Sequence, residues 1–248
     1  MAGLGQGPWR LDAVTVAIPL PQPQRRGVFV QRLNRFAVEV SLDGMPAVAH
    51  LPNSGRMREL LVPGHPVIVV EQPGAHRKTP YDLLLVQYRN QWVSVDARLP
   101  SALAAAALRA QALPEWADYT TVRREVAYHD SRLDIELTAP GGRRCLIETK
   151  SCNLVEEGIA LFPDAPTTRG ARHLHTLIHA TQHGIAAAAL FIIQRADARV
   201  LRPFDTADPA FGQALRQAAK AGVTVAAYGC CMTPDAMTLA APVLVDLS

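Results

Sequence analysis

The sequence has few cysteines and no long apolar run, and each absence excludes a class of protein. Its four cysteines are Cys145, Cys152, Cys230 and Cys231. None forms a C-x-x-C pair, so neither a zinc knuckle nor a secreted disulfide framework is indicated, and a reducing setting fits best. No stretch reaches the roughly 18 apolar residues that a membrane span needs. Residues 1–13 lack the apolar core of a signal peptide. We therefore expect a cytoplasmic protein with no membrane partner.

Lysine is also scarce, and the charge is unevenly placed. Only Lys78, Lys150 and Lys220 are lysine among 25 basic residues. A lysine in an Arg-biased chain can mark a place that needs a compact ammonium group, although drift accounts for any one of them more simply. Residues 1–98 hold 11 Lys+Arg against 7 Asp+Glu, whereas residues 99–248 hold 14 against 15. A basic half beside a carboxylate-bearing half suits a polyanionic partner.

The first half of the chain reads as short strands separated by turns. Strands are predicted at 28–33, 35–42, 47–51, 67–71, 81–89 and 92–96, with Pro and Gly between several of them. This spacing is compatible with a five-stranded oligonucleotide-binding (OB) barrel and also with other small barrels. We assign residues 14–98 to this β-rich domain and treat residues 1–13 as an extension.

The second half alternates strands and helices. A helix is predicted after Pro100, with Ser101 as its N-cap. Strands follow at 121–128, 132–138, 143–150, 187–194 and 223–228, with helices at 168–183 and 209–221 that end at Gly184 and Gly222. The pattern predicts a mixed α/β domain over residues 99–248.

A hairpin in the second domain brings acidic residues together. The strands at 132–138 and 143–150 flank the turn sequence Ala-Pro-Gly-Gly at 139–142. Pairing Thr138 with Arg143 places Asp134 one residue short of Glu148, and a shift of one residue would set the carboxylates opposite each other. Glu148 and Lys150 share a strand face because side chains alternate with a period of two.

This arrangement predicts a divalent-metal site. Two neighbouring carboxylates repel each other and favour a hard cation such as Mg²⁺, or Mn²⁺ in its place. Such an ion activates water and polarises a phosphate, and an adjacent lysine can stabilise the charge that develops. The competing interpretation is an ordinary surface hairpin with a neighbouring Glu/Lys pair.

Motifs along nearly the whole chain favour the first interpretation. They are Arg-Leu-Asn-Arg-Phe at 32–36, His-Leu-Pro-Asn-Ser-Gly-Arg-Met at 50–57, Arg-Lys-Thr at 77–79, Ser-Arg-x-Asp at 131–134, Glu-Thr-Lys-Ser at 148–151, Phe-Pro-Asp-Ala-Pro-Thr-x-Arg-Gly at 162–170 and Gln-Arg at 194–195. Through these motifs the chain resembles the sugar fermentation stimulation protein A family.

The resemblance implies an N-terminal OB-like barrel, a restriction-endonuclease-like domain of the Asp…Glu-x-Lys type, DNA as partner and a link to sugar, particularly maltose, metabolism. It also implies Glu125 as an early acidic residue and third metal ligand beside Asp134 and Glu148. Gln194 would be the polar residue that ends a later core strand. Leu133 stands where the superfamily's label has a proline, a position that varies widely.

Residues for DNA contact are predicted from charge. The candidates are Arg35, Arg56, Arg58, Arg77, Lys78 and Arg169. Asp164 and Thr167 are added beside Arg169 because their loop enters a predicted helix, where backbone N–H groups can bind phosphate. Phe29, Phe36 and Tyr81 can offer stacking faces to single strands. Aromatics in strands are more often core, so we expect Phe36 to be buried. His175, His179 and His183 share a helix face and form an alternative transition-metal site.

Two functional hypotheses follow. The first is a Mg²⁺-dependent DNA phosphodiesterase in which Asp134, Glu148, Lys150, Glu125 and Gln194 form the catalytic site. The second is a non-catalytic DNA-binding regulator of sugar metabolism genes on a nuclease scaffold. A sugar-metabolising enzyme is disfavoured because no phosphate-cradling Gly-rich motif is present. The oligomeric state stays open, with a homodimer among the options.

Overall fold

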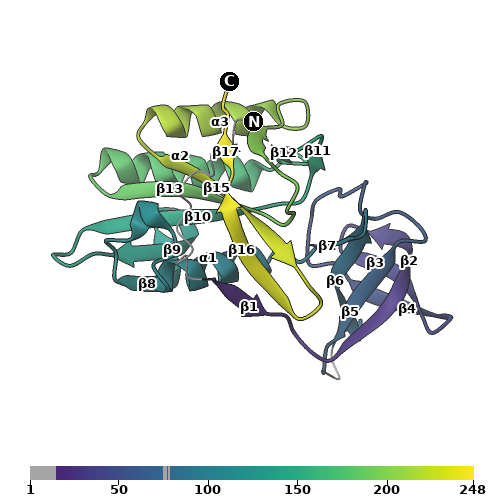
Figure 1. The fold of residues 1–248 in the computed structure, drawn as a ribbon. Coiled ribbons are helices and arrows are strands. Elements are labelled where there is room, and N and C mark those ends of the chain that lie inside the picture. The colour runs from purple at the N-terminus through teal and green to yellow at the C-terminus, as the bar shows by residue number, and fades with distance from the viewer. Residues whose placement is uncertain (1–14, 75–76, 78) are drawn as a thin grey trace, which may run out of the picture.

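The protein consists of an N-terminal β-barrel and a larger C-terminal α/β domain, which lie side by side (Figure 1). The computed structural model describes residues 15–74, 77 and 79–248. The predicted fold class is confirmed for both domains. In the described part of the chain, no helix is long and apolar enough to cross a bilayer.

The barrel is built from five strands that close on themselves. The strands are β2 (Gln24–Asn34), β3 (Ala37–Leu42), β4 (Met45–His50), β5 (Pro66–Glu71) and β6 (Tyr81–Tyr88), and β7 (Gln91–Ser94) extends the sheet from β6. A short parallel pairing of β4 with β6 closes the barrel. Alternation sets its core, since Val38, Val40 and Leu42 of β3 point inward between partly exposed neighbours.

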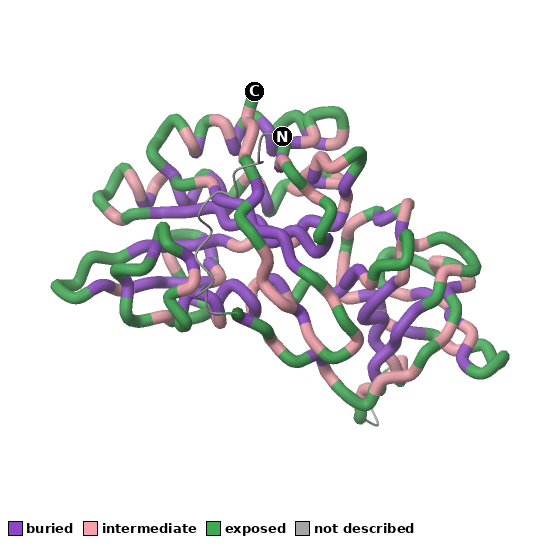
Figure 2. Tube along the Cα trace, viewed as in Figure 1, coloured by how far each residue is buried: buried purple, intermediate pink, exposed green. Residues whose placement is uncertain are grey.

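The C-terminal domain is centred on a seven-stranded sheet in the order β1-β16-β15-β13-β10-β9-β8. Its strands are β1 (Ala17–Pro19), β8 (Thr121–Tyr128), β9 (Ser131–Thr138), β10 (Arg144–Cys152), β13 (Ala186–Ile193), β15 (Thr224–Met232) and β16 (Ala236–Pro242). β10, β13 and β15 run parallel. Figure 2 shows the buried residues concentrated along these central strands. The run Ala-Ala-Ala-Ala-Leu-Phe-Ile-Ile of β13 fits this place, because a strand covered on both faces needs apolar residues throughout.

Helices cover both faces of the sheet (Figure 1). α1 (Leu99–Arg109) packs on one face, and α2 (Thr168–Gln182) and α3 (Pro209–Lys220) pack on the other. Beside β10 lies a small sheet of β11 (Val155–Glu156), β12 (Ile159–Phe162), β14 (Val200–Pro203) and β17 (Leu244–Val245), and a 3-10 turn, η1 (Pro114–Trp116), follows α1. The small sheet was not predicted from the sequence, because strands this short lack a readable period.

Three expectations about the fold are wrong in detail. β1 pairs with β16 of the C-terminal sheet and not with the barrel, so the barrel begins at β2 and not at residue 14. Ser101 is not an N-cap, because α1 begins at Leu99 and its N-cap Arg98 makes no side-chain capping bond. Phe36 is 47% exposed and not buried, since it lies in the turn between β2 and β3. Residues 1–13 lie outside the described residues.

Candidate metal and nucleic-acid site

The β9–β10 hairpin brings the two predicted carboxylates near each other, since the charge of Glu148 acts on Asp134. Thr138 pairs with Arg144, one residue later than Arg143, and the ladder continues to Ile135 opposite Ile147. The shift of one residue in the register is therefore confirmed up to that pair, where the recorded ladder ends. The next pair in the same register would be Asp134 with Glu148.

Glu148 lies at the centre of a buried polar cluster. The Lys150 Nζ donates to Glu148 Oε1 at 2.8 Å, as their shared strand face predicts. His173 of α2 contacts the same oxygen through its Nδ1. All three side chains are less than one tenth exposed. The buried ammonium and imidazole thus satisfy one of the two oxygens of Glu148.

Arg169 fixes the proton on His173. The Arg169 Nε donates to His173 Nε2 across 3.4 Å, so that ring nitrogen acts as an acceptor. A neutral His173 must then carry its proton on Nδ1, where it donates to Glu148. The helix therefore orients the carboxylate of β10 through a defined tautomer.

The two carboxylates have opposite pKa shifts. Burial raises the pKa of Glu148, but the charge of Lys150 and the hydrogen bond from His173 outweigh burial and leave this pKa below its usual range. The pKa of Asp134 is raised, first by burial and then by the charge of Glu148. The backbone N–H of Thr149, at 2.8 Å, and its hydroxyl both donate to Asp134 and offset part of that rise. A cation between the two carboxylates would offset the burial of both charges and the repulsion between them.

One oxygen of the cluster is left without a partner. Glu148 Oε2 is buried and accepts no hydrogen bond from any described residue. A buried carboxylate oxygen without a partner is costly, and a bound ion is one way in which a protein offsets that cost. Two carboxylates suit Mg²⁺, which binds through one or two protein carboxylates plus water and phosphate. Asp134 and Glu148 therefore fit the predicted ion.

Glu125, the expected third ligand, does not join this pair. Its side chain is 49% exposed and forms an ion pair with Arg132 Nε at 3.0 Å. Its positive φ of 56° interrupts the ladder between Arg124 and Val126. Within the described residues there is no group of three or more His, Cys, Asp or Glu side chains placed to hold a metal. The site therefore offers two protein carboxylates and not three.

The alternative histidine site is not formed either. The rings of His179 and His183 stack at 4.0 Å, and His129 lies 4.3 Å from His179. Their stacking produces no metal-binding group in the part of the chain that the structure describes. This row lies on a different face of α2 from His173, which is buried against the sheet with Leu174 and Leu177.

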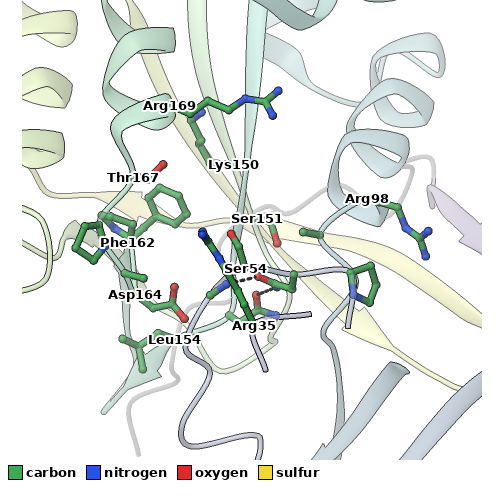
Figure 3. A pocket seen from close by; sticks show the side chains of 18 of the residues that line it. Arg35, Ser54, Arg98, Lys150, Ser151, Leu154, Phe162, Asp164, Thr167 and Arg169 are labelled. Carbon is green, nitrogen blue, oxygen red and sulfur yellow. Dashed lines mark hydrogen bonds between the residues drawn. The ribbon is translucent and has the colours of Figure 1, made fainter. Parts of the chain in front are cut away.

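Lys150 opens onto a cleft of about 830 Å³ between the two domains. In Figure 3, Lys150 and Arg169 lie at one end of the cleft, on the C-terminal domain, and Arg35 rises toward them from the opposite, barrel side. Two contacts tie the walls together. Met57 N donates to Asp164 Oδ2 at 3.0 Å, and Asn53 Nδ2 to Asn153 Oδ1 at 3.4 Å. Asp164 is the one acidic residue among the described residues that line this cleft.

The other predicted DNA-contacting residues are spread over different places. Arg56 and Arg58 are exposed and line a second cavity, of about 860 Å³. Arg77 is ion-paired with Asp82, which is 1% exposed, so its charge is already compensated inside the barrel. Lys78 lies outside the described residues. The cleft thus receives only Arg35 and Arg169 from the predicted set.

Gln194 follows β13, as predicted for a polar residue that ends a core strand. Its Nε2 donates to the Ser151 hydroxyl at 2.9 Å, and its Oε1 is buried without a partner among the described residues. Gln194 N donates to Cys152 O at 2.8 Å. Gln194 therefore lies behind Ser151, which itself lines the cleft.

Sequence reasoning left the role of His173 open and did not foresee that Asp164 contacts the barrel. Helical periodicity contained a signal for His173, because it lies four residues before the apolar Leu177 and seven before Ala180, all on the buried face. For Asp164 the sequence indicated a turn-rich loop that could contact phosphate, and gave no sign of a contact with the barrel. Its bond to Met57 joins residues 107 positions apart.

Comparisons with known proteins agree with this architecture. The family "Sugar fermentation stimulation protein RE domain" matches residues 98–236, and "SfsA N-terminal OB domain" matches residues 30–95. A "Sugar fermentation stimulation protein homolog" of Moorella thermoacetica is 43% identical over 231 residues, which cover 93% of this chain and 100% of that protein. The homolog of Symbiobacterium thermophilum is 44% identical over 247 residues, 94% of this chain and 98% of that protein.

A solved structure is similar over the same length. Pyrococcus furiosus SfsA in complex with Ca²⁺ has a TM-score of 0.84 and 28% identity, covering 91% of this chain and 97% of that chain. The fold and the matched families define a protein in which an OB barrel precedes an RE domain. The chain belongs to the sugar fermentation stimulation protein (SfsA) family, which confirms the resemblance seen in its motifs.

Proposed function

We propose that this protein binds DNA in the interdomain cleft and cleaves a phosphodiester bond with the help of a divalent cation. The observation that supports the proposal most directly is the unpartnered, buried oxygen of Glu148 beside Asp134 and Lys150. A purely structural Glu–Lys pair would gain nothing from leaving that oxygen unsatisfied.

Each residue has a distinct part in the proposal. Asp134 and Glu148 would hold Mg²⁺ or Mn²⁺. When bound, the ion would polarise the scissile phosphate and lower the pKa of a coordinated water. Lys150 would place its ammonium beside the phosphate and stabilise the charge that develops there. His173 would keep Glu148 ionised and oriented, and Arg169 at the cleft would attract the phosphate backbone.

The cation requirement has support from a relative. Pyrococcus furiosus SfsA was solved in complex with Ca²⁺, a hard cation that takes oxygen ligands as Mg²⁺ does. The raised pKa of Asp134 gives an independent reason, because a nearby cation would favour its ionised form.

The test is incubation of the purified protein with duplex, nicked, branched and single-stranded DNA in Mg²⁺, Mn²⁺ or EDTA. We expect cleavage only with metal. Lys150→Ala should slow the chemical step by about 10²–10³, the usual effect of removing one transition-state donor, and should leave DNA binding nearly unchanged. Equal cleavage by wild type, Lys150→Ala and Asp134→Asn would point to a contaminating nuclease. Binding without any cleavage would favour the non-catalytic regulator.

A further inference from the structure

Flat side chains gather on the barrel side of the cleft. The Phe36 ring is 47% exposed, the Arg35 guanidinium lies 5.4 Å from its centroid, and the His50 ring lies 6.4 Å away at 31°. All three residues line the cleft that contains Lys150. An exposed aromatic ring beside a guanidinium is the kind of surface on which unpaired bases stack.

The backbone holds this group in place. Phe36 O accepts from Leu51 N at 2.8 Å and contacts His50 Nδ1 at 3.0 Å, and Ala37 pairs with His50 across β3 and β4. The exposure of Phe36 therefore belongs to a fixed turn at the rim of a closed barrel. The barrel core is already filled by residues such as Val38 and Val40, and it has no need of this ring.

The cleft is large enough for a nucleotide. Its volume of about 830 Å³ lies within the range of pockets that hold one drug-sized molecule, about 300–1,000 Å³. In a duplex the faces of the bases are covered by their neighbours, so the Phe36 ring has no base face to contact until a base leaves the stack.

We propose that the cleft binds a single DNA strand, with an unpaired base stacked on Phe36 and Arg35 and its backbone directed to Arg169 and Lys150. This inference rests on the proposed function and specifies its substrate as single-stranded DNA or a single-stranded segment of a branched molecule. Arg35 on one wall and Lys150 and Arg169 on the other line the cleft and supply positive charge along it (Figure 3).

The test is binding in EDTA, so that cleavage plays no part. Fluorescence anisotropy of the full chain would be measured with a labelled oligothymidine of about 16 nucleotides, the upper site size of an OB fold, and with a duplex of the same length. We expect the single strand to bind more tightly. Phe36→Ala should weaken single-strand binding by about 5- to 140-fold, equivalent to about 1–3 kcal/mol for one stacked base, and should change duplex binding little. Phe36→Trp should restore the affinity.

A matched control is Met45→Ala. Met45 is also exposed and apolar on the barrel, at 69%, but does not line the cleft. Truncation of the Met45 side chain should leave the affinities for the single strand and for the duplex unchanged. Tighter binding of the duplex, or equal effects of Phe36→Ala and Met45→Ala, would overturn the single-strand inference. Metal-dependent cleavage could survive that result, whereas failure to bind either form of DNA would overturn the proposed function as well.

Discussion

Removal of the Lys150 ammonium should destabilise the C-terminal domain by an amount that depends on pH. Lys150→Met keeps the length of the side chain but leaves Glu148, which is 5% exposed, without its cationic partner. Loss of one member of a buried ion pair costs about 3–5 kcal/mol. Protonation of Glu148 limits the loss, because neutralising a carboxyl with an unfolded-state pKa of about 4.3 costs about 3.7 kcal/mol at pH 7 and about 1 kcal/mol at pH 5. The hydrogen bond from His173 also remains. We expect a loss of about 3 kcal/mol at pH 7 and about 1 kcal/mol at pH 5.

The direction follows from the pKa of Glu148. In the wild type this pKa is lowered by Lys150 and His173 against the effect of burial. The ionised Glu148 side chain therefore stabilises the folded wild type above its unfolded-state pKa, about 4.3. This stabilisation is lost as the pH falls through the folded-state pKa. In Lys150→Met, burial is less opposed and the folded-state pKa rises. That variant is then most stable below about pH 4.3 and loses stability as the pH rises, so the gap to wild type widens from pH 5 to pH 7.

The assay is urea unfolding in EDTA at pH 5 and at pH 7, monitored by tryptophan fluorescence. Trp116, which is 5% exposed, reports on the core of the C-terminal domain. Lys220→Met is the control, because Lys220 is exposed in the last turn of α3 and its charge contributes only about 0.3–1 kcal/mol to that helix. The buried ion pair would be refuted as a source of stability by either of two results. One is a loss of unfolding free energy in Lys150→Met equal to that in Lys220→Met, and the other is a loss that does not change between pH 5 and pH 7.

Four further outcomes are expected. Arg35→Ala should flatten the slope of log K against log salt for single-strand binding by about 0.7, the value for one phosphate contact, in a salt titration. Arg77→Ala should keep that slope and instead lower the free energy of unfolding by about 1–3 kcal/mol in urea denaturation, because its buried carboxylate partner loses a donor. Gly55→Ala should lower the thermal midpoint of unfolding. A Cβ at this position would lie 2.7 Å from a carboxylate oxygen of Asp164 and push that side chain away from the barrel, which would break its hydrogen bond with Met57 N. Asp134→Asn should abolish heat of Mg²⁺ or Mn²⁺ binding in calorimetry, and heat equal to wild type would exclude Asp134 as a ligand.

The sequence by itself determined the features that depend on neighbouring residues. The strands of the barrel and of the central sheet follow from alternation and turn residues, and the C-termini of α2 and α3 follow from Gly184 and Gly222, which adopt positive φ. Glu148 and Lys150 share a face because the strand period is two, and this needed no knowledge of the rest of the fold. Carboxylates and a lysine at this spacing are compatible with a hard cation and a phosphate, but the resemblance of the motifs to a known family, and not the spacing alone, favoured that chemistry over an ordinary surface hairpin.

Only the tertiary structure decided how distant segments meet. The hairpin register shifted by one residue, because the turn closes with Ala139 N donating to Arg143 O and Gly142 N to Ala139 O, a detail that the turn sequence alone did not specify. The contact of His173 with Glu148 depends on how α2 packs on the sheet, and the pairing of β1 with β16 joins opposite ends of the chain. Glu125 was separated from the carboxylates by a local backbone irregularity that no periodic pattern reveals. The cleft exists because two domains meet there, and an interface between domains leaves no period in the sequence of either one.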